Sequence, residues 1–346
     1  MTSSTPTLRD VAAEAGVSPM TASNALRGKP GVKESTRAKV IAAAKKLNYR
    51  INLTASMLKS GRSNIIHVIV NEFDSPFYSK LTQALSNEIV SRGLIPFIEQ
   101  TQYSPDAAEH ALSSNPFSGQ LFDGEILHAT GLGTNVPLSK LNGGRPFVLL
   151  DACEETPTVD AVNFPNEEAE RAAMQHLVGH RFAPRADLAH AQNAFALRLR
   201  GACGALSDAG LPYDESMVFE AGDVANGIIA GHAIAERILA ARSGHGGTEF
   251  DGACCANDFA AFGVIRGLAD RGLRVPQDVK VIGFDGVTSG SYTTPALSTI
   301  QVDFTQLAKF SVDMLSERID HGTDEALPPR RAIIGYQLVD RESTAV

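Results

Sequence analysis

Hydrophobic positions follow two different patterns along the chain, one before and one after about residue 60. The first part has short apolar patterns with the 3.6-residue period of amphipathic helices. Within it, the stretch DVAAEAGVSPMTASNAL (10–26) contains two such patterns separated by Gly16. Thr7, with Asp10 three residues later, has the form of a capping box that begins a helix, and Gly16 permits the sharp turn that ends it. The pattern therefore predicts two short helices joined by a tight turn.

The second predicted helix begins at a Ser-Pro pair and runs to about Leu26. Ser18 is a suitable N-cap, and Pro19 fits the first helical position because its missing N–H would have no partner there. The face predicted to pack on Val11 and Ala15 of the first helix consists of Ala22, Ala25 and Leu26. The opposite face, which is free to reach outward, carries Met20, Asn24 and Arg27.

A third helix is predicted from about Glu34 to Leu47, with a buried stripe formed by Val40, Ile41, Ala44 and Leu47. Three short helices around one small core, with the second held outward, form a helix-turn-helix. In that arrangement the N-terminal end of the second helix enters the major groove of DNA. A purely structural helical hairpin shows the same pattern, so the pattern alone leaves both interpretations open.

The charge distribution favours the DNA interpretation. The chain has a formal net charge of −8, but residues 1–60 contain ten Lys/Arg against three acidic residues, a net charge of +7, which leaves −15 for the rest. Such asymmetry is typical of a small module for a polyanion attached to a larger acidic body. A basic, solvated surface without a partner would give the same count.

Beyond residue 62, apolar runs alternate with amphipathic stretches. The predicted strands are IIHVIVN (65–71), LIPFIEQ (94–100), GEILHAT (124–130), FVLLDA (147–152), ADLAHA (186–191), ACCAND (253–258), VKVIGFD (279–285) and IIGYQLV (333–339). Helical stretches separate most of them, which requires parallel sheets covered on both faces. About 285 residues are long for one such sheet, so we expect an α/β core of two doubly wound parallel sheets.

Ligands of such sheets bind at the carboxyl ends of the strands. The polar and aromatic residues just after the predicted strands, or on the helix that follows, are Asp74, Ser75, Phe77, Tyr78, Asp151, Arg198, Asn257, Asp258 and Asp285. Carboxylates, an amide, an arginine and aromatic rings in one cleft would suit a polyol, since they can bond its hydroxyls and cover its apolar face. Each can instead be a cap or turn residue, and for Asp258 taken singly the helix N-cap is the preferred interpretation.

Several motifs resemble the LacI (lac repressor) family of bacterial transcription regulators. The segment TLRDVAAEAGVSPMTASNALRGKPGVKESTRAKVIAAAKKLNY (7–49) resembles the DNA-binding domain, here residues 1–49. By this resemblance Pro19, Met20 and Asn24 face base edges, and Thr21 and Ser23 contact phosphates. The full candidate DNA-binding set is Thr7, Ser18, Pro19, Met20, Thr21, Ser23, Asn24, Arg27, Asn52, Ala55 and Leu58. Asn24 stands where the family often has arginine, and an asparagine amide suits adenine better than guanine.

Residues 50–61 resemble the hinge of the family, within RINLTASMLKSGR (50–62). The resemblance implies a segment that becomes helical on DNA, pairs with its dimer mate in the minor groove and inserts Leu58 into a base step. The segment departs from the family at Ile51, where proline is usual, and at Ser56, where arginine is usual. A simple flexible linker is therefore the open alternative.

Residues 62–346 resemble the periplasmic-binding-protein-like core of the family, with two interleaved α/β subdomains. The landmarks are DSPFY (74–78), HLVGH (176–180), RLRG (198–201), CANDFAAFG (255–263), RVPQDVKVIGFDG (274–286) and TPALSTIQVDF (294–304). The candidate effector-binding residues are Asp74, from the strand ends, and, from the resemblance, Phe77, Tyr78, Asp151, Arg198, Asn257, Asp285 and Phe304. Two departures touch the cleft wall: Gly286, where a second aspartate is common, and AHAQNAF (189–195), which lacks the usual Gly-Pro.

No catalytic motif accompanies these features in the sequence. There is no GxSxG elbow, Walker loop or HExxH motif, and GLGTN (131–135) is a simple glycine turn. His176 and His180 have the spacing of a metal-binding pair but lack a third ligand pattern. The four cysteines show no CxxC spacing and are expected to be buried, reduced thiols. We expect no catalytic residues, no metal and no cofactor.

The sequence therefore predicts a repressor whose affinity for a palindromic DNA operator changes when an effector, a sugar or sugar derivative, binds between the core subdomains. We expect the effector to be an inducer, which lowers the affinity of the protein for its operator. We expect a homodimer, with a tetramer as the alternative, because one head offers few DNA contacts. The sequence shows neither an apolar signal segment nor a membrane span, so we expect a cytoplasmic protein. The alternative function is a sugar-binding or sugar-acting protein with an incidental basic N-terminus.

Overall fold

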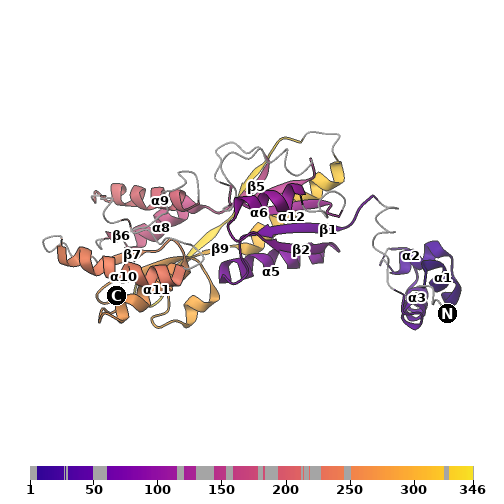
Figure 1. Ribbon diagram of the computed structural model, residues 1–346, viewed down its shortest axis with the longest axis horizontal. Coiled ribbons are helices and arrows are strands. Elements are labelled where there is room, and N and C mark those ends of the chain that lie inside the picture. Colours follow the sequence, from indigo (N-terminus) through magenta and orange to yellow (C-terminus); the bar gives the residue numbers. More distant parts are fainter. Residues whose placement is uncertain are drawn as a thin grey trace. The chain divides into compact units, whose positions relative to one another are not determined.

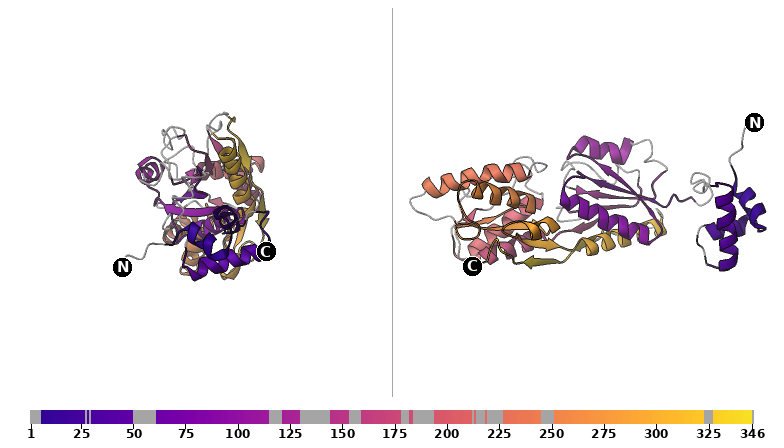
Figure 2. Two further views of the ribbon diagram at one scale, coloured as in Figure 1. Left: turned by 90° about the vertical axis from the view of Figure 1, so that its right-hand side faces the viewer. Right: turned by 90° about the horizontal axis from the view of Figure 1, so that it is seen from below.

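The computed structural model describes most of the chain (Figures 1 and 2). The described residues are 6–26, 28, 30–49, 61–114, 121–129, 144–152, 159–177, 182–183, 194–211, 213, 218, 227–244, 251–322 and 327–345. The chain divides into two compact units, Met1–Ser63, called the head here, and Asn64–Val346, called the core. The predictions that fall outside the described residues concern Arg27, the hinge with Asn52, Ala55 and Leu58, the glycine turn at 131–135, Cys153, His180 and the strand at 186–191.

Three helices form the head, α1 (Leu8–Ala15), α2 (Pro19–Leu26) and α3 (Glu34–Lys46). The predicted capping box is confirmed, because the Thr7 hydroxyl accepts from the Asp10 N–H (3.4 Å) and the Asp10 carboxylate accepts from the Thr7 N–H (2.8 Å). These bonds hold the pKa of Asp10 below its usual range. Gly16 has φ 66°, the left-handed conformation that ends α1. The Thr21 N–H donates to Ser18 Oγ at 3.1 Å, which confirms Ser18 as the N-cap of α2.

Small side chains fill the centre of the head. The buried cluster consists of Val11, Ala12, Ala22, Ala25, Val40, Ala43 and Ala44, with Leu8, Ala15, Leu26 and Leu47 packed against it. The prediction that Ile41 is buried is wrong, because its side chain is 52% exposed. The inner face of α3 continues from Val40 to Ala43 and Ala44, three and four residues on, and Ile41 lies about 100° around the helix from Val40.

Two sheets form the core, as predicted. The first has the strand order β10 (Arg331–Ile333), β5 (Asp160–Asn163), β4 (Phe147–Leu150), β3 (Gly124–His128), β1 (Ile65–Val70) and β2 (Ile95–Gln100), with all neighbours parallel. The second has the order β11 (Tyr336–Val339), β9 (Ser298–Val302), β8 (Lys280–Asp285), β7 (Gly252–Cys254) and β6 (Phe182–Ala183), in which only β11 is antiparallel to its neighbour. Each sheet with its helices is called a subdomain here.

Helices cover both sheets. The first subdomain has α5 (Pro76–Ser91), α6 (Pro105–Glu109), the π-helical turn η1 (His110–Ser114) and α12 (Phe304–His321). The second has α8 (Asn166–Leu177), α9 (Ala194–Asp208), α10 (Gly227–Gly244), α11 (Asp258–Ala269) and the 3₁₀ turn η5 (Thr288–Tyr292). In Figure 1 the α8–α9 pair and the α10–α11 pair lie on opposite sides of the second sheet. Strand β1 is buried on both faces, since Val68 belongs to the cluster with α5 and Ile69 to the cluster with η1.

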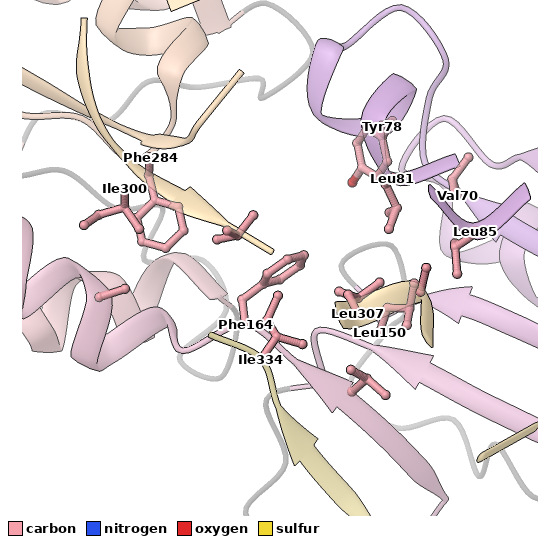
Figure 3. Packing of buried hydrophobic residues seen from close by; sticks show 14 of the residues in the cluster. Val70, Tyr78, Leu81, Leu85, Leu150, Phe164, Phe284, Ile300, Leu307 and Ile334 are labelled. Atoms are coloured by element: carbon pink, nitrogen blue, oxygen red, sulfur yellow. The ribbon is translucent and has the colours of Figure 1, made fainter. Parts of the chain in front are cut away.

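The chain passes between the two sheets three times, from β5 to α8, from β9 to α12 and from β10 to β11. One hydrophobic cluster spans these crossings (Figure 3). In it, Phe164 and Ile334 lie between Leu150 of the first sheet and Phe284 of the second. The subdomains thus share apolar packing along the crossing segments.

Six of the predicted strand segments each coincide with one strand, but the prediction of a single strand at 333–339 is wrong. That segment holds the end of β10 and all of β11, which belong to different sheets, because the chain crosses between them at Ile334 and Gly335. The short strands β5, β6 and β9 were not predicted. Among the described residues, no helix is both long and apolar enough to cross a membrane.

Candidate functional sites: the outer face of the head and the cavity of the core

The head presents the first turns of α2 to solvent. Met20 is 61% exposed, and Thr7, Ser18 and Pro19 are exposed as well, whereas Thr21, Ser23 and Asn24 are half-buried. The hydroxyls of Ser18 and Thr21 lie 2.9 Å apart. Hydroxyls and backbone N–H groups at a helix N-terminus are the usual partners of a phosphate, and exposed side chains beside them can reach base edges. The described part of the outer face therefore fits a DNA backbone and its major groove.

Two basic residues of the head brace its own fold. Arg37 Nη1 donates to the Ala25 carbonyl at 2.7 Å, which ties α3 to the last turn of α2. Lys46 Nζ pairs with Glu14 at 2.7 Å and ties α3 to α1. These contacts hold the helices in the arrangement that presents α2.

A cavity opens at the carboxyl ends of strands from both sheets. Its walls are formed by Glu72, Asp74, Ser75, Phe77, Tyr78, Tyr103, His128, Asp151, Ala194, Phe195, Arg198, Asn257, Phe259 and Asp285. The residues up to Asp151 belong to the first subdomain and those from Ala194 onward to the second. A ligand in the cavity would thus contact both subdomains.

A chain of buried polar groups organises the second subdomain's wall. Arg198, on α9, donates through Nε to Asn166 Oδ1 at 2.9 Å and through Nη1 to the Ala256 carbonyl. Its guanidinium carbon lies 3.6 Å from the centre of the Phe284 ring. Asn166 in turn donates to Asp151 Oδ1 at 2.7 Å, across the crossing between the sheets. Arg198 is therefore fixed in place before any ligand binds.

Asp285, at the end of β8, is the least satisfied buried carboxylate of the cavity. It is 6% exposed, and Arg198 Nη1 lies 3.8 Å away, beyond hydrogen-bond distance. Within the described part of the chain its carboxylate accepts no hydrogen bond. Burial raises the pKa of Asp285 well above its usual range, although the Arg198 charge opposes this. Its φ of 114° is a strained conformation for a residue other than glycine, and Asp151, at the end of β4, also has a positive φ of 58°.

Tyrosines and a histidine shape the first subdomain's wall. Tyr78 OH accepts from Asn71 Nδ2 at 2.7 Å and lies 3.4 Å from His128 Nδ1. Tyr103 OH donates to Glu72 Oε1 at 2.9 Å, which orients that carboxylate. Burial lowers the pKa of His128 to about 3, so this imidazole is neutral at physiological pH. The wall combines aromatic faces with fixed hydrogen-bonding groups.

More buried acids lie behind the second wall. Glu170, on α8, accepts from the Cys254 thiol at 2.9 Å, and burial raises the pKa of Glu170 to about 7. Asp258 accepts from the Val287 N–H (2.7 Å) and the Thr299 hydroxyl (2.6 Å), and burial raises its pKa to about 7. The thiols of Cys254 and Cys255 are free and buried, as predicted, whereas Cys203 forms no disulfide but is only half-buried, so the prediction is wrong for that residue.

Seven of the eight predicted effector residues line the cavity, namely Asp74, Phe77, Tyr78, Asp151, Arg198, Asn257 and Asp285. Phe304 does not, because the first turn of α12 holds its ring against Phe77 (5.4 Å between ring centres) and Phe164. The N-cap interpretation of Asp258 is also wrong. Asn257 caps α11, since its Oδ1 accepts from the Ala260 N–H at 2.8 Å, and Asp258 joins α11 to β9.

The lining residues that the sequence analysis missed are Glu72, Tyr103, His128, Ala194, Phe195 and Phe259. Glu72, Tyr103 and His128 lie at or just after the carboxyl ends of β1, β2 and β3. The rule that ligands bind at the carboxyl ends of parallel strands, which identified Asp151 and Asp285, therefore applies to these three residues as well. Among the described residues, His, Cys, Asp and Glu form no group of three that could hold a metal ion, and His176 contacts Thr344 at 2.9 Å.

An outward-facing helix on a small head, joined to a two-subdomain core with a cavity, is the architecture of a DNA-binding transcriptional regulator. Residues 7–52 match the family of bacterial regulatory proteins named lacI, and residues 168–344 match a periplasmic binding protein-like domain. The chain belongs to the LacI family of bacterial transcriptional regulators.

Relatives of known name support this assignment over almost the whole chain. Catabolite control protein A of Priestia megaterium is 29% identical over 331 residues, which are 92% of this chain and 93% of that protein. The transcriptional regulator CelR of Thermobifida fusca is 30% identical over 98% of both chains. Among solved structures, a CelR–cellobiose complex is similar with a TM-score of 0.71, 28% identity and coverage of 98% of this chain and 99% of that chain. A lac repressor dimer bound to operator and an anti-inducer has a TM-score of 0.80, 26% identity and coverage of 99% and 100%.

Proposed function

We propose that this protein is a repressor whose operator affinity changes when a sugar or sugar derivative binds in the cavity of the core. The observation that carries the proposal is a cavity with walls from both subdomains, polar groups fixed before binding, and aromatic rings beside them. Fixed carboxylates and amides suit ligand hydroxyls, and the rings of Phe77 and Phe195 suit the apolar face of a sugar. The similarity to a CelR–cellobiose complex supports a carbohydrate.

The proposed mechanism links the cavity to the head through the orientation of the subdomains. Three chain crossings join the sheets, and Lys80 of α5 also donates to the Gly286 carbonyl, just after β8, at 2.6 Å. A ligand that contacts Asp285 and Tyr78 together favours one orientation of the two walls. In a homodimer that reorientation changes the spacing of the two heads, and operator affinity falls. We therefore propose that the effector is an inducer.

Selection of random duplex DNA by the purified full-length protein, followed by a salt titration on the recovered duplex, tests this function. We expect a palindrome whose affinity falls steeply with salt, as phosphate contacts require, and release of that duplex by a sugar. If a folded, dimeric protein recovers no DNA with or without a mixture of sugars and sugar phosphates, the proposal is wrong. If removal of residues 1–60 leaves every activity intact, the alternative of a sugar-binding protein with an incidental basic N-terminus is correct instead.

A further inference from the structure

The cavity walls carry more acidic than basic side chains. Four carboxylates line the cavity, from Glu72, Asp74, Asp151 and Asp285, and among the described lining residues Arg198 is the only permanent cation. We infer, on the basis of the proposed effector site, that the cavity rejects phosphorylated and other anionic sugars, so that the effector is an unphosphorylated sugar. His128 does not alter the balance, because it is neutral at physiological pH.

The single guanidinium is already engaged within the protein. Arg198 uses Nε on Asn166 and Nη1 on the Ala256 carbonyl, and it lies flat on Phe284 with Asp285 3.8 Å away. A phosphate would have to share this cation with the Asp285 carboxylate. Strong phosphate sites instead present several free donors, such as an arginine fork or a glycine-rich loop. Arg198 therefore orients hydroxyls and balances part of the negative charge of the wall.

Helix N-termini at the cavity act in the opposite direction, and their contribution is smaller. The first turns of α5, α9 and α11 contribute lining residues, and each N-terminus carries about half a positive charge. Part of this charge is offset by the chain itself. Asp74 precedes α5, whose first residue is a proline without an N–H, and Asp258 lies in the first turn of α11. The helix N-termini therefore reduce the repulsion that a phosphate meets in the cavity, but they do not supply the free cationic side-chain donors of a strong phosphate site.

The surroundings of Asp285 indicate which chemical group of a ligand it would bind. Its carboxylate is buried and strained in backbone conformation, and it accepts no hydrogen bond from the described residues. A ligand hydroxyl can donate to this carboxyl group when it is ionised and accept from it when it is protonated. A phosphate dianion offers no proton to the ionised carboxylate and is repelled by it. Repulsion between charges in a partly dry cavity is strong, so we expect a sugar phosphate to bind at least about 100-fold more weakly than the free sugar.

The chemistry of the effector then limits its place in metabolism. An unphosphorylated sugar is supplied by hydrolysis of a glycoside or by uptake that leaves the sugar unmodified. A kinase removes it, because phosphorylation converts it into a form that the cavity rejects. The regulator would thus respond to sugar that has not yet been phosphorylated.

The test compares matched compounds on the full-length protein. The probes are glucose, galactose, mannose and cellobiose, each with its 6-phosphate, and binding is measured by calorimetry together with release of the selected operator duplex. The double variant Glu72→Gln/Asp74→Asn removes two wall charges, and the glutamine amide oxygen can still accept from Tyr103. We expect it to narrow the ratio of sugar to sugar-phosphate affinity by about tenfold. The matched control, Asp106→Asn/Glu109→Gln, changes the net charge equally on α6, outside the lining residues, and should leave the ratio unchanged.

Each outcome decides a separate point. A free sugar that binds at least about 100-fold more tightly than its phosphate, with a narrower ratio in the cavity variant alone, supports the inference. A phosphate that binds as tightly as its sugar overturns the inference and leaves the proposed function standing. If the ratio of sugar to sugar-phosphate affinity is the same in the two double variants, the charge of Glu72 and Asp74 is not what excludes the phosphate. If no probe binds or releases the operator, the proposed carbohydrate effector is wrong, and the inference falls with it.

Discussion

The head and the core place their functional residues by different means. In the head, each helix cap lies within a few residues of its partner, the packing partners come from three consecutive helices, and the buried cluster is built mostly from alanine. In the core, the cavity gathers residues from Glu72 to Asp285, brought together by strand order and three crossings. The head depends on local fit in a very small core, whereas the effector site depends on the topology of a large one. Variants can test this difference in order of decreasing effect.

The largest effect is expected from Ala22→Glu in the head. Ala22 is fully buried between α1 and α3, and a carboxylate there has neither space nor a partner. We expect the head to unfold and operator affinity to fall more than about 100-fold, while calorimetry shows an unchanged thermal transition of the core. Ala42→Glu adds the same charge at an exposed position of α3 and is the control. Similar operator binding by both variants would show that the folded head is not the DNA-binding part.

The next largest effect is expected from Asp285→Asn in the core. The change preserves shape but replaces one carboxyl oxygen with an amide NH₂ group, which cannot accept a hydrogen bond from a ligand hydroxyl, so effector affinity should fall by about 10- to 100-fold. Operator affinity without effector should stay within about twofold, because Asp285 belongs to a different unit from the head. Calorimetry and a DNA-binding titration measure the two quantities, with Asp106→Asn as the control. A loss of both activities together would contradict the site assignment.

Glu170→Gln should alter how the stability of the core depends on pH. The folded-state pKa of Glu170 is about 7, above its usual value of 4.5, so between these values the folded core binds protons that the unfolded chain lacks. The free energy of unfolding should therefore rise as pH falls from about 8 to about 5. The variant should reduce this rise by about 2 kcal/mol. Denaturation at several pH values measures it, with exposed Glu168→Gln as the control, and identical profiles for wild type and Glu170→Gln would refute the account.

The smallest effect concerns two adjacent residues of α3. Val40→Ala should cost the head about 1–2 kcal/mol, because Val40 is fully buried. Ile41→Ala should cost less than about 0.5 kcal/mol, because Ile41 is half exposed. Hydrogen exchange of the α3 amides measures both in the full-length protein. Equal losses of stability in the two variants would instead support the sequence-based prediction that Ile41 belongs to the buried face of α3.

The sequence predicted most of what depends on local chemistry. Thr7, Gly16 and Ser18 each determine a helix end through their own backbone or side chain, and all three behave as predicted. Ile41 was misplaced because a stripe of four residues fits the period equally well until three helices compete for one small core. The segment at 333–339 looks like one strand because apolar content does not reveal a crossing between sheets.

The candidate site was predictable where a strand end could be recognised. Asp151 and Asp285 follow clear strands, and Arg198 was identified both from its place on the helix after a predicted strand and from the resemblance to a family. Tyr103 was missed because two residues with positive φ, Gln102 and Tyr103 itself, turn the chain after β2. The hydrogen bonds of Arg198 to Asn166 and Ala256 join segments far apart in sequence, and only the folded core shows that this cation is engaged.

The central claim is that the cavity and the head are linked, and linkage is reciprocal. The most direct measurement is the affinity of the full-length protein for an effector sugar, by calorimetry, with and without saturating operator duplex. For an inducer, operator should weaken sugar binding by the same factor by which sugar weakens operator binding, about 5- to 150-fold. Equal sugar affinities with and without operator would mean that the two sites are independent, and the account would be wrong.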